Sequence, residues 1–200
     1  MNEIDECFLV RNEKSPSDPT VGCPPILHSA KDSLSWFVMR ATYSREMRAK
    51  SLLEAEGVEC YVPLRKERNE GKDILLPVVH NLIFVRTTRE FMDLWKRKVE
   101  GDCPLRYAMD SATDKPMVVR DKEMEDFIRV TQDANDDILY LDNPKVTITK
   151  GKDVEIVSGI YKGIRGKVMR ILRNRRVVVS VNGIIAVALN GIPFSDMKEI

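Results

Sequence analysis

Hydrophobic and polar positions alternate with a period of two in several short stretches, and this pattern predicts β-strands. In the first two thirds of the chain the predicted strands cover residues 36–41, 58–64, 74–86, 105–109 and 116–120. Pro77 lies inside the third stretch and predicts an edge or a bulge there, because proline cannot donate to a sheet ladder. The charged residues 65–73 before it predict a hairpin loop.

Three other segments have apolar residues at helical spacing. Residues 45–56 predict a helix with Ser44 as its N-cap and Gly57 as its stop. A second helix is expected with Thr87 or Thr88 as its cap, and a third with Asp121 as its cap. Strands followed by helices, with short connections between them, predict an α+β fold in which helices cover an antiparallel sheet.

The last quarter of the chain has no helical pattern. Its predicted strands are residues 152–157, 167–172, 176–181 and 184–189. Asn182-Gly183 between the last two is the preferred sequence of a tight hairpin turn. This segment therefore predicts a small, separate all-β domain.

These patterns divide the chain into four parts. Residues 1–33 are rich in proline and serine and predict a disordered or loosely docked extension. Residues 34–132 form the α+β domain, residues 133–147 an acidic linker, and residues 148–200 the β domain.

Charge is distributed unevenly between these parts. The net charge of the whole chain is +1, but residues 150–200 contain 10 Lys and Arg against 4 Asp and Glu. A basic C-terminal part joined to an acidic body fits a two-domain adaptor with different partners better than a protein that coats nucleic acid. The acidic N-terminus and the absence of a long apolar run indicate a cytoplasmic protein without a signal peptide or membrane span.

Catalytic and metal-binding patterns have little support. The chain contains two histidines, His28 and His80, in unrelated contexts, and no phosphate-binding glycine loop. Its four widely spaced cysteines, which include Cys60 and Cys103, are expected to be free thiols. We therefore expect neither an enzyme nor a cofactor or metal site.

A glycine-rich pattern, G-x-x-V-x-I-x-x-G-x-x-K-G-x-x-G-x-V, spans residues 151–168 and resembles the KOW motif of small barrels in transcription elongation factors and some ribosomal proteins. Its defining positions are Gly151, Val154, Ile156, Gly159, Lys162, Gly163, Gly166 and Val168. The glycines permit backbone conformations that other residues avoid, so we interpret them as structural.

Residues 34–200 resemble the NusG family of transcription elongation factors. The resemblance rests on the Trp36-Phe37-Val38-Met39 strand, the helix after Ser44, the strand ending in Ile83-Phe84-Val85 and the KOW domain. Residues 37–43, 77–85, 124–130 and 175–179 are similar to UpxY-type paralogues, which are associated with capsular polysaccharide operons of Bacteroides-like bacteria. His80-Asn81-Leu82 replaces the Pro-Gly-Tyr that is common in the general family.

The resemblance implies an apolar patch that docks on the clamp region of RNA polymerase. The matching residues are Phe37, Val79, Leu82 and Phe84. An exposed apolar patch marks a protein interface, but strand alternation lets only about half of such residues point outward. The alternative is that these residues belong to the core.

Basic residues and an aromatic one surround the start of the first helix: Arg40, Tyr43, Arg45 and Arg48. Such residues can hold a phosphate backbone and stack a base. The resemblance implies that they face non-template DNA or nascent leader RNA, while a solvated helix face is the alternative. In the β domain, four arginines of one hairpin could meet RNA, an acidic protein surface or solvent: Arg170, Arg173, Arg175 and Arg176.

The implied function is operon-specific antitermination by a monomeric factor that binds elongating polymerase. Its barrel would recruit a ribosomal protein or the termination factor Rho. A general elongation factor and an RNA-binding, ribosome-associated KOW protein are the alternatives.

Overall fold

The computed structural model describes residues 34–69, 71–132, 138–141, 151–171, 174–181 and 183–200. All described residues belong to one unit, Asp32–Ile200. The extension predicted for residues 1–33 lies outside the described residues. Within the described ranges, no helix is long and apolar enough to cross a membrane.

An antiparallel sheet forms the centre of the N-terminal domain, as predicted. Its strands follow the order β2-β5-β1-β6, and β9 also pairs with β1. They are β1 (Ser35–Ala41), β2 (Glu59–Tyr61), β5 (Leu82–Thr87), β6 (Leu105–Tyr107) and β9 (Val118–Val119). Val38 and Phe37 of β1 are buried in different hydrophobic clusters because successive side chains point to opposite faces of a sheet.

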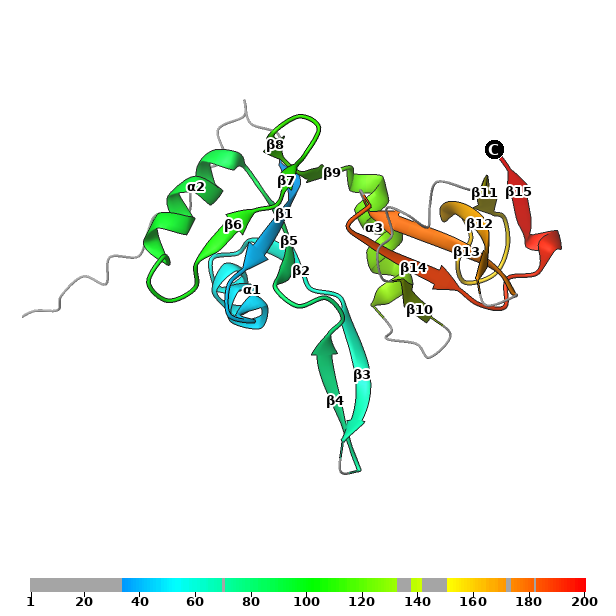
Figure 1. Cartoon of the computed structure of the whole chain (residues 1–200), viewed down its shortest axis with the longest axis horizontal. Coiled ribbons are helices and arrows are strands. Elements are labelled where there is room, and N and C mark those ends of the chain that lie inside the picture. The colour runs from blue at the N-terminus through cyan, green and yellow to red at the C-terminus, as the bar shows by residue number, and fades with distance from the viewer. Residues whose placement is uncertain (1–33, 70, 133–137, 142–150, 172–173, 182) are drawn as a thin grey trace, which may run out of the picture. The chain divides into compact units, whose positions relative to one another are not determined.

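Helices cover both faces of this sheet (Figure 1). α1 (Glu46–Ala55) and α2 (Arg89–Lys98) pack on the face that contains Phe37, and α3 (Asp121–Thr131) packs on the face that contains Val38. Thr88 caps α2 as predicted, accepting a hydrogen bond from the Phe91 amide at 3.2 Å. The predicted caps at Ser44 and Asp121 are wrong. Arg45 occupies the N-cap position of α1 and Arg120 that of α3, and neither helix has a side-chain cap.

β3 (Leu64–Asn69) and β4 (Lys72–Pro77) form a separate two-stranded hairpin, which extends away from the central sheet in Figure 1. The predicted bounds here are wrong, because the charged stretch 65–73 supplies most of β3 and the start of β4, and the expected strand 74–86 breaks between β4 and β5. Both faces of most of this ribbon meet solvent, so charged residues occupy it without alternation. β7 (Met109–Asp110) and β8 (Lys115–Pro116) form a second short hairpin.

The C-terminal domain is a six-stranded antiparallel sheet with the order β10-β14-β13-β12-β11-β15. Its strands are β10 (Ile138–Leu141), β11 (Lys152–Ile156), β12 (Arg165–Ile171), β13 (Asn174–Val181), β14 (Ile185–Leu189) and β15 (Met197–Glu199). A short 3-10 helix, η1 (Phe194–Asp196), precedes β15. β10 falls within residues 133–147, so part of the range predicted to be a linker instead forms an edge strand paired with β14.

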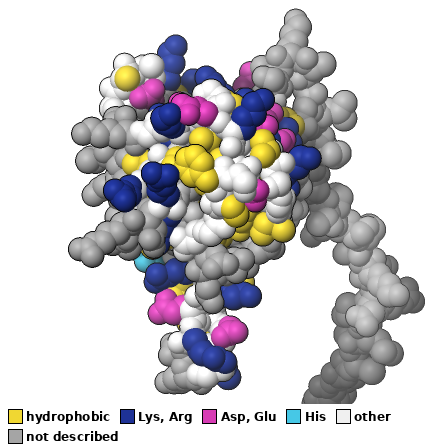
Figure 2. All heavy atoms as spheres, turned by 90° about the vertical axis from the view of Figure 1, so that its right-hand side faces the viewer, with side chains coloured by type: hydrophobic (Ala, Val, Ile, Leu, Met, Phe, Trp, Pro, Cys, Tyr) yellow, Lys and Arg dark blue, Asp and Glu magenta, His cyan; other side chains and the backbone are white. Residues whose placement is uncertain are grey.

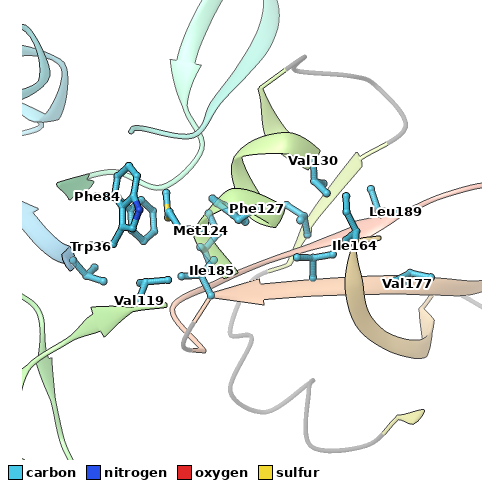
Figure 3. Close-up of a cluster of buried hydrophobic side chains, with 14 of the residues drawn as sticks. Trp36, Phe84, Val119, Met124, Phe127, Val130, Ile164, Val177, Ile185 and Leu189 are labelled. Carbon is cyan, nitrogen blue, oxygen red and sulfur yellow. The ribbon is translucent and has the colours of Figure 1, made fainter. Parts of the chain in front are cut away.

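One hydrophobic cluster contains side chains from the N-terminal sheet, from α3 and from the C-terminal six-stranded sheet, which is called the barrel below (Figure 3). The Phe127 ring of α3 lies 6.0 Å from the Phe84 ring and 6.2 Å from the Tyr61 ring, measured between centroids. On its other side, the Arg129 guanidinium donates hydrogen bonds to the Ile160 carbonyl at 2.8 Å and the Lys162 carbonyl at 3.0 Å. α3 therefore contacts the N-terminal sheet through buried rings and the C-terminal domain through these exposed hydrogen bonds.

Candidate functional site

The loop between β1 and α1 and the turn between β4 and β5 are joined by one hydrogen bond. The Ser44 amide donates to Asn81 Oδ1 at 2.7 Å. Tyr43, Ser44 and Asn81 have positive φ angles of 58°, 52° and 62°. Non-glycine residues adopt this left-handed conformation at a cost, so its clustering here marks a backbone that its surroundings hold in place. The arrangement leaves the Tyr43 side chain 83% exposed.

Two arginines beside this loop are positioned by Asp102, which follows α2. Arg48 donates to Asp102 Oδ2 from Nε at 3.3 Å and from Nη2 at 3.0 Å. Arg45 donates to the Asp102 carbonyl, and its guanidinium carbon lies 5.8 Å from the centre of the Tyr43 ring. Exposed ion pairs of this kind contribute about 0–1 kcal/mol. A phosphate group can therefore replace the Asp102 carboxylate at little cost.

Arg40 lies on β1 directly opposite Arg106 on β6. Both are exposed, and opposite residues of an antiparallel pair project from the same face. No ion pair to either guanidinium occurs in the described part of the chain. Like charges directly opposite destabilise a sheet, so an anion bound between them would relieve that cost. The sequence analysis missed Arg106, because its position beside Arg40 depends on strand pairing.

A buried carboxylate lies at the base of the loop. Glu46 is 1% exposed, and its Oε1 lies 4.0 Å from Nδ1 of the exposed His80. Its other oxygen, Oε2, has no hydrogen-bond partner among the described residues. An acidic residue in the first turn complements the positive end of α1. Glu46 therefore lies beneath the loop and is not part of its exposed surface.

Three of the four residues expected to contact polymerase are buried. Leu82 and Phe84 are 0% exposed and belong to the cluster beneath α3 (Figure 3). Phe37 is 7% exposed on the opposite face, with its ring centre 5.5 Å from that of Tyr107. For these three residues, the structure supports the alternative that they are core. Val79 is only partly buried, at the turn before β5.

The KOW residues occupy β11, β12 and the loop that joins them. Val154 and Ile156 are buried, and Val168 pairs with Lys152. The Ile156 carbonyl accepts a hydrogen bond from the Gly163 amide at 2.7 Å, which closes the loop. Gly159, Lys162 and Gly166 lie in or beside this turn, whereas Gly151 precedes β11 at the other end of the strand.

The close approach of the strands explains one of these glycines directly. A Cβ atom at Gly166 would lie 2.6 Å from the Val178 carbonyl oxygen on β13. Contacts this short require the backbone to move, so only glycine fits here without distortion.

The described thiols have little nucleophilic character. Burial is the main cause that raises the pKa of Cys60 to about 11, and burial also raises the pKa of Cys103. Both thiols therefore remain protonated near neutral pH, whereas thiolates are the reactive form. No cluster of His, Cys, Asp and Glu suited to a metal ion occurs within the described ranges.

Comparison with known proteins finds a matching family model for the N-terminal domain and a similar solved structure. Residues 34–128 match the NusG family model, which is described as "Transcription termination factor nusG". A solved structure entitled "Domain interaction in Thermotoga maritima NusG" aligns with 84% of this chain and 98% of that chain, at 17% sequence identity and a TM-score of 0.46. No curated protein matches the chain.

Proposed function

We propose that this protein is an operon-specific transcription antiterminator that binds elongating RNA polymerase and suppresses pausing and termination. The proposal of a transcription role is supported by the match of residues 34–128 to a family described as a transcription termination factor. The match covers the central sheet, α1, α2 and most of α3. It therefore includes every residue of the candidate site around Tyr43.

The proposed polymerase contact is the turn that contains Val79 and His80, which docks on the clamp region. Val79 is the accessible member of the predicted apolar set. Leu82 and Phe84 pack beneath this turn in the core, so they fix its position instead of touching the polymerase. Phe37 has the same supporting role from the other face of the sheet.

The proposed nucleic-acid contact is the group Tyr43, Arg45 and Arg48 around the start of α1, with Arg40 and Arg106 as a second basic pair that projects from the other face of the sheet. The arginines hold the phosphate backbone, and the exposed Tyr43 ring stacks a base of non-template DNA or nascent leader RNA. Contact of this surface with the leader sequence gives the choice of operon. The similarity of several stretches to UpxY-type proteins suggests capsular polysaccharide genes as the target.

Antitermination follows from differential binding. A factor that binds the active polymerase more tightly than the paused polymerase shifts the population toward the active state. No chemical step by the protein is needed for this effect, so the proposed factor is non-enzymatic. We further propose that it acts in the cytoplasm as a monomer. The barrel recruits a second protein, which by the resemblance is a ribosomal protein or Rho.

A transcription assay on matched templates tests this proposal. Leaders of capsular polysaccharide operons and unrelated leaders are each placed before the same terminator. We expect readthrough to rise on the target leader, and to fall back when both Tyr43→Ala and Arg48→Ala are introduced. Arg97→Ala, an exposed arginine on α2, is the control and should keep the activity.

The outcomes separate the alternatives. An equal effect on every leader would identify a general elongation factor. No effect on any leader, together with binding to ribosomal RNA, would identify a ribosome-associated KOW protein.

A further inference from the structure

Two arginines face each other on the barrel. Arg170 on β12 is the direct cross-strand partner of Arg175 on β13, and both are exposed. Val168 and Val177, each two residues away along its strand, also pair with each other and pack in the large hydrophobic cluster. The two arginines therefore project from the same face of the sheet as these valines. No ion pair to either guanidinium is present in the described part of the barrel. Like charges in this position destabilise the sheet until an anion neutralises them.

An exposed aromatic ring lies beside them. Phe194 is 66% exposed, and the Arg175 guanidinium carbon lies 5.3 Å from the centre of its ring. Burial normally removes a ring of this size from water. A phenylalanine that stays exposed next to a guanidinium is typical of surfaces on which bases stack.

A hollow opens between this ring and the strands. It has a volume of about 340 Å³ and an apolar floor that includes Val154, Val168 and Met197. Lys152 and Arg175 contribute to its lining, and Lys152 forms an exposed ion pair with Glu199 at 2.8 Å. Figure 2 views the side where β11, β12 and β15 lie in Figure 1, and it shows hydrophobic side chains near the centre of the face with Lys and Arg side chains around them.

We propose that this face of the barrel binds single-stranded RNA. One base stacks on Phe194 and enters the hollow, while Arg170, Arg175 and Lys152 contact the phosphates on either side. An acidic protein segment would form ion pairs with the arginines, but it would supply no flat apolar group to stack on the Phe194 ring and cover the apolar floor of the hollow. A base supplies both a flat apolar face and an adjacent negative charge. The excess of basic residues in the segment 150–200, 10 against 4, favours the same ligand.

This inference goes beyond the proposed function, because none of these residues belongs to the polymerase or nucleic-acid site of the N-terminal domain. For a factor bound to polymerase, the second site would hold the emerging transcript near the enzyme. The two proposals are tested by different measurements, since RNA binding to the free protein requires no polymerase.

The test measures binding of an unstructured, fluorescently labelled RNA of 12 nucleotides to the full-length protein by fluorescence anisotropy. Tyr43→Ala and Arg48→Ala are present throughout, so that the N-terminal surface contributes little. In this background Phe194→Ala should weaken binding about tenfold or more, and Phe194→Trp should restore it. Arg175→Gln should reduce the slope of log K against log salt by about 0.7, the value for one phosphate contact to a single strand. Leu94→Ala, which alters an exposed residue on α2, should change nothing.

Three results would overturn the inference. The first is unchanged RNA affinity in Phe194→Ala with the fold retained by circular dichroism. The second is equally tight binding of a duplex RNA, because paired bases cannot enter the hollow. The third is displacement of the RNA by an acidic peptide that binds wild type and Phe194→Ala equally, which would assign the face to an acidic protein. Polymerase binding by Phe194→Ala should match wild type, so failure here leaves the proposed function intact.

Discussion

Alanine at position 166 should destabilise the barrel, and the structure gives the size of the effect. The new Cβ would lie 2.6 Å from the Val178 carbonyl oxygen and 2.9 Å from Val177 Cγ1. Val178 pairs with Lys167 in the β12–β13 ladder, so its carbonyl cannot rotate away without breaking the pairing. Ordinary contact distances would require the strands to separate by about 1 Å. Overpacking of this kind costs about 1–3 kcal/mol.

Two other glycines provide matched controls with different physical causes. Gly163 has a φ of 85° and open space around its Cα, so Gly163→Ala should cost only the left-handed backbone strain of about 1–2 kcal/mol. Gly101 has open space and no left-handed φ, so Gly101→Ala should be close to neutral. The expected order of destabilisation is Gly166→Ala, then Gly163→Ala, then Gly101→Ala.

Amide hydrogen exchange read by mass spectrometry locates the effect within one molecule. A loss of 2 kcal/mol corresponds to roughly 30-fold faster exchange of peptides from β12 and β13. Peptides from β1 and β5 serve as the internal reference. Exchange of β12 and β13 in Gly166→Ala at the wild-type rate would refute the reasoning that a close strand approach requires glycine at this KOW position.

Three further predictions concern the core, the loop and a thiol. Phe127→Ala should lower the free energy of unfolding by about 3–5 kcal/mol, because this ring is fully buried against Phe84. Urea denaturation measures this loss, and a loss no larger than that caused by Ile128→Ala, at a half-buried position, would contradict the prediction. Asn81→Ala should speed proteolysis at Tyr43, because the Ser44 amide loses its acceptor and alanine must adopt a left-handed φ; cleavage at the wild-type rate would refute this. Burial raises the pKa of Cys60 from 9.0 to about 11, so its alkylation, followed by peptide mass spectrometry, should have a midpoint near pH 11. Because Cys60 has a higher pKa in the folded state than in the unfolded state, the stability associated with its protonated thiol is fully present below pH 9 and is lost between about pH 9 and 11. An alkylation midpoint near pH 9 would contradict this prediction.

The sequence predicts well those elements whose hydrophobic pattern or helix cap is set by residues within the element itself. β1 is apolar on both faces because helices cover both, and the strands of the barrel lie close to their predicted bounds. α2 has a side-chain cap at Thr88, and the helix begins at the next residue as expected.

The hairpin β3–β4 and the strand β10 could not be predicted in the same way. The hairpin has solvent on both sides of most of its length, so hydrophobic alternation is absent. β10 gains its order from pairing with β14, which lies far away in the sequence. Long-range pairing overrides the local acidic composition on which the linker prediction rests.

The candidate site was predictable by residue type but not by accessibility. Tyr43, Arg45 and Arg48 lie together on the surface around the start of α1. The local sequence contains no sign that Asp102 holds these arginines, because that contact depends on the path of the chain after α2. The same limit applies to Leu82 and Phe84, whose burial depends on where α3 packs.

The affinity for RNA polymerase tests the central claim most directly. The organism's own polymerase is titrated with wild type, with Val79→Asp and with Leu94→Asp, a control at an exposed position of α2. Each variant is first shown to be folded by circular dichroism. If the turn before β5 docks on the polymerase, Val79→Asp should bind about tenfold more weakly or worse, because a charge enters an apolar contact, while Leu94→Asp should bind like wild type. Equal affinity of all three proteins, or no affinity in any, would contradict the account.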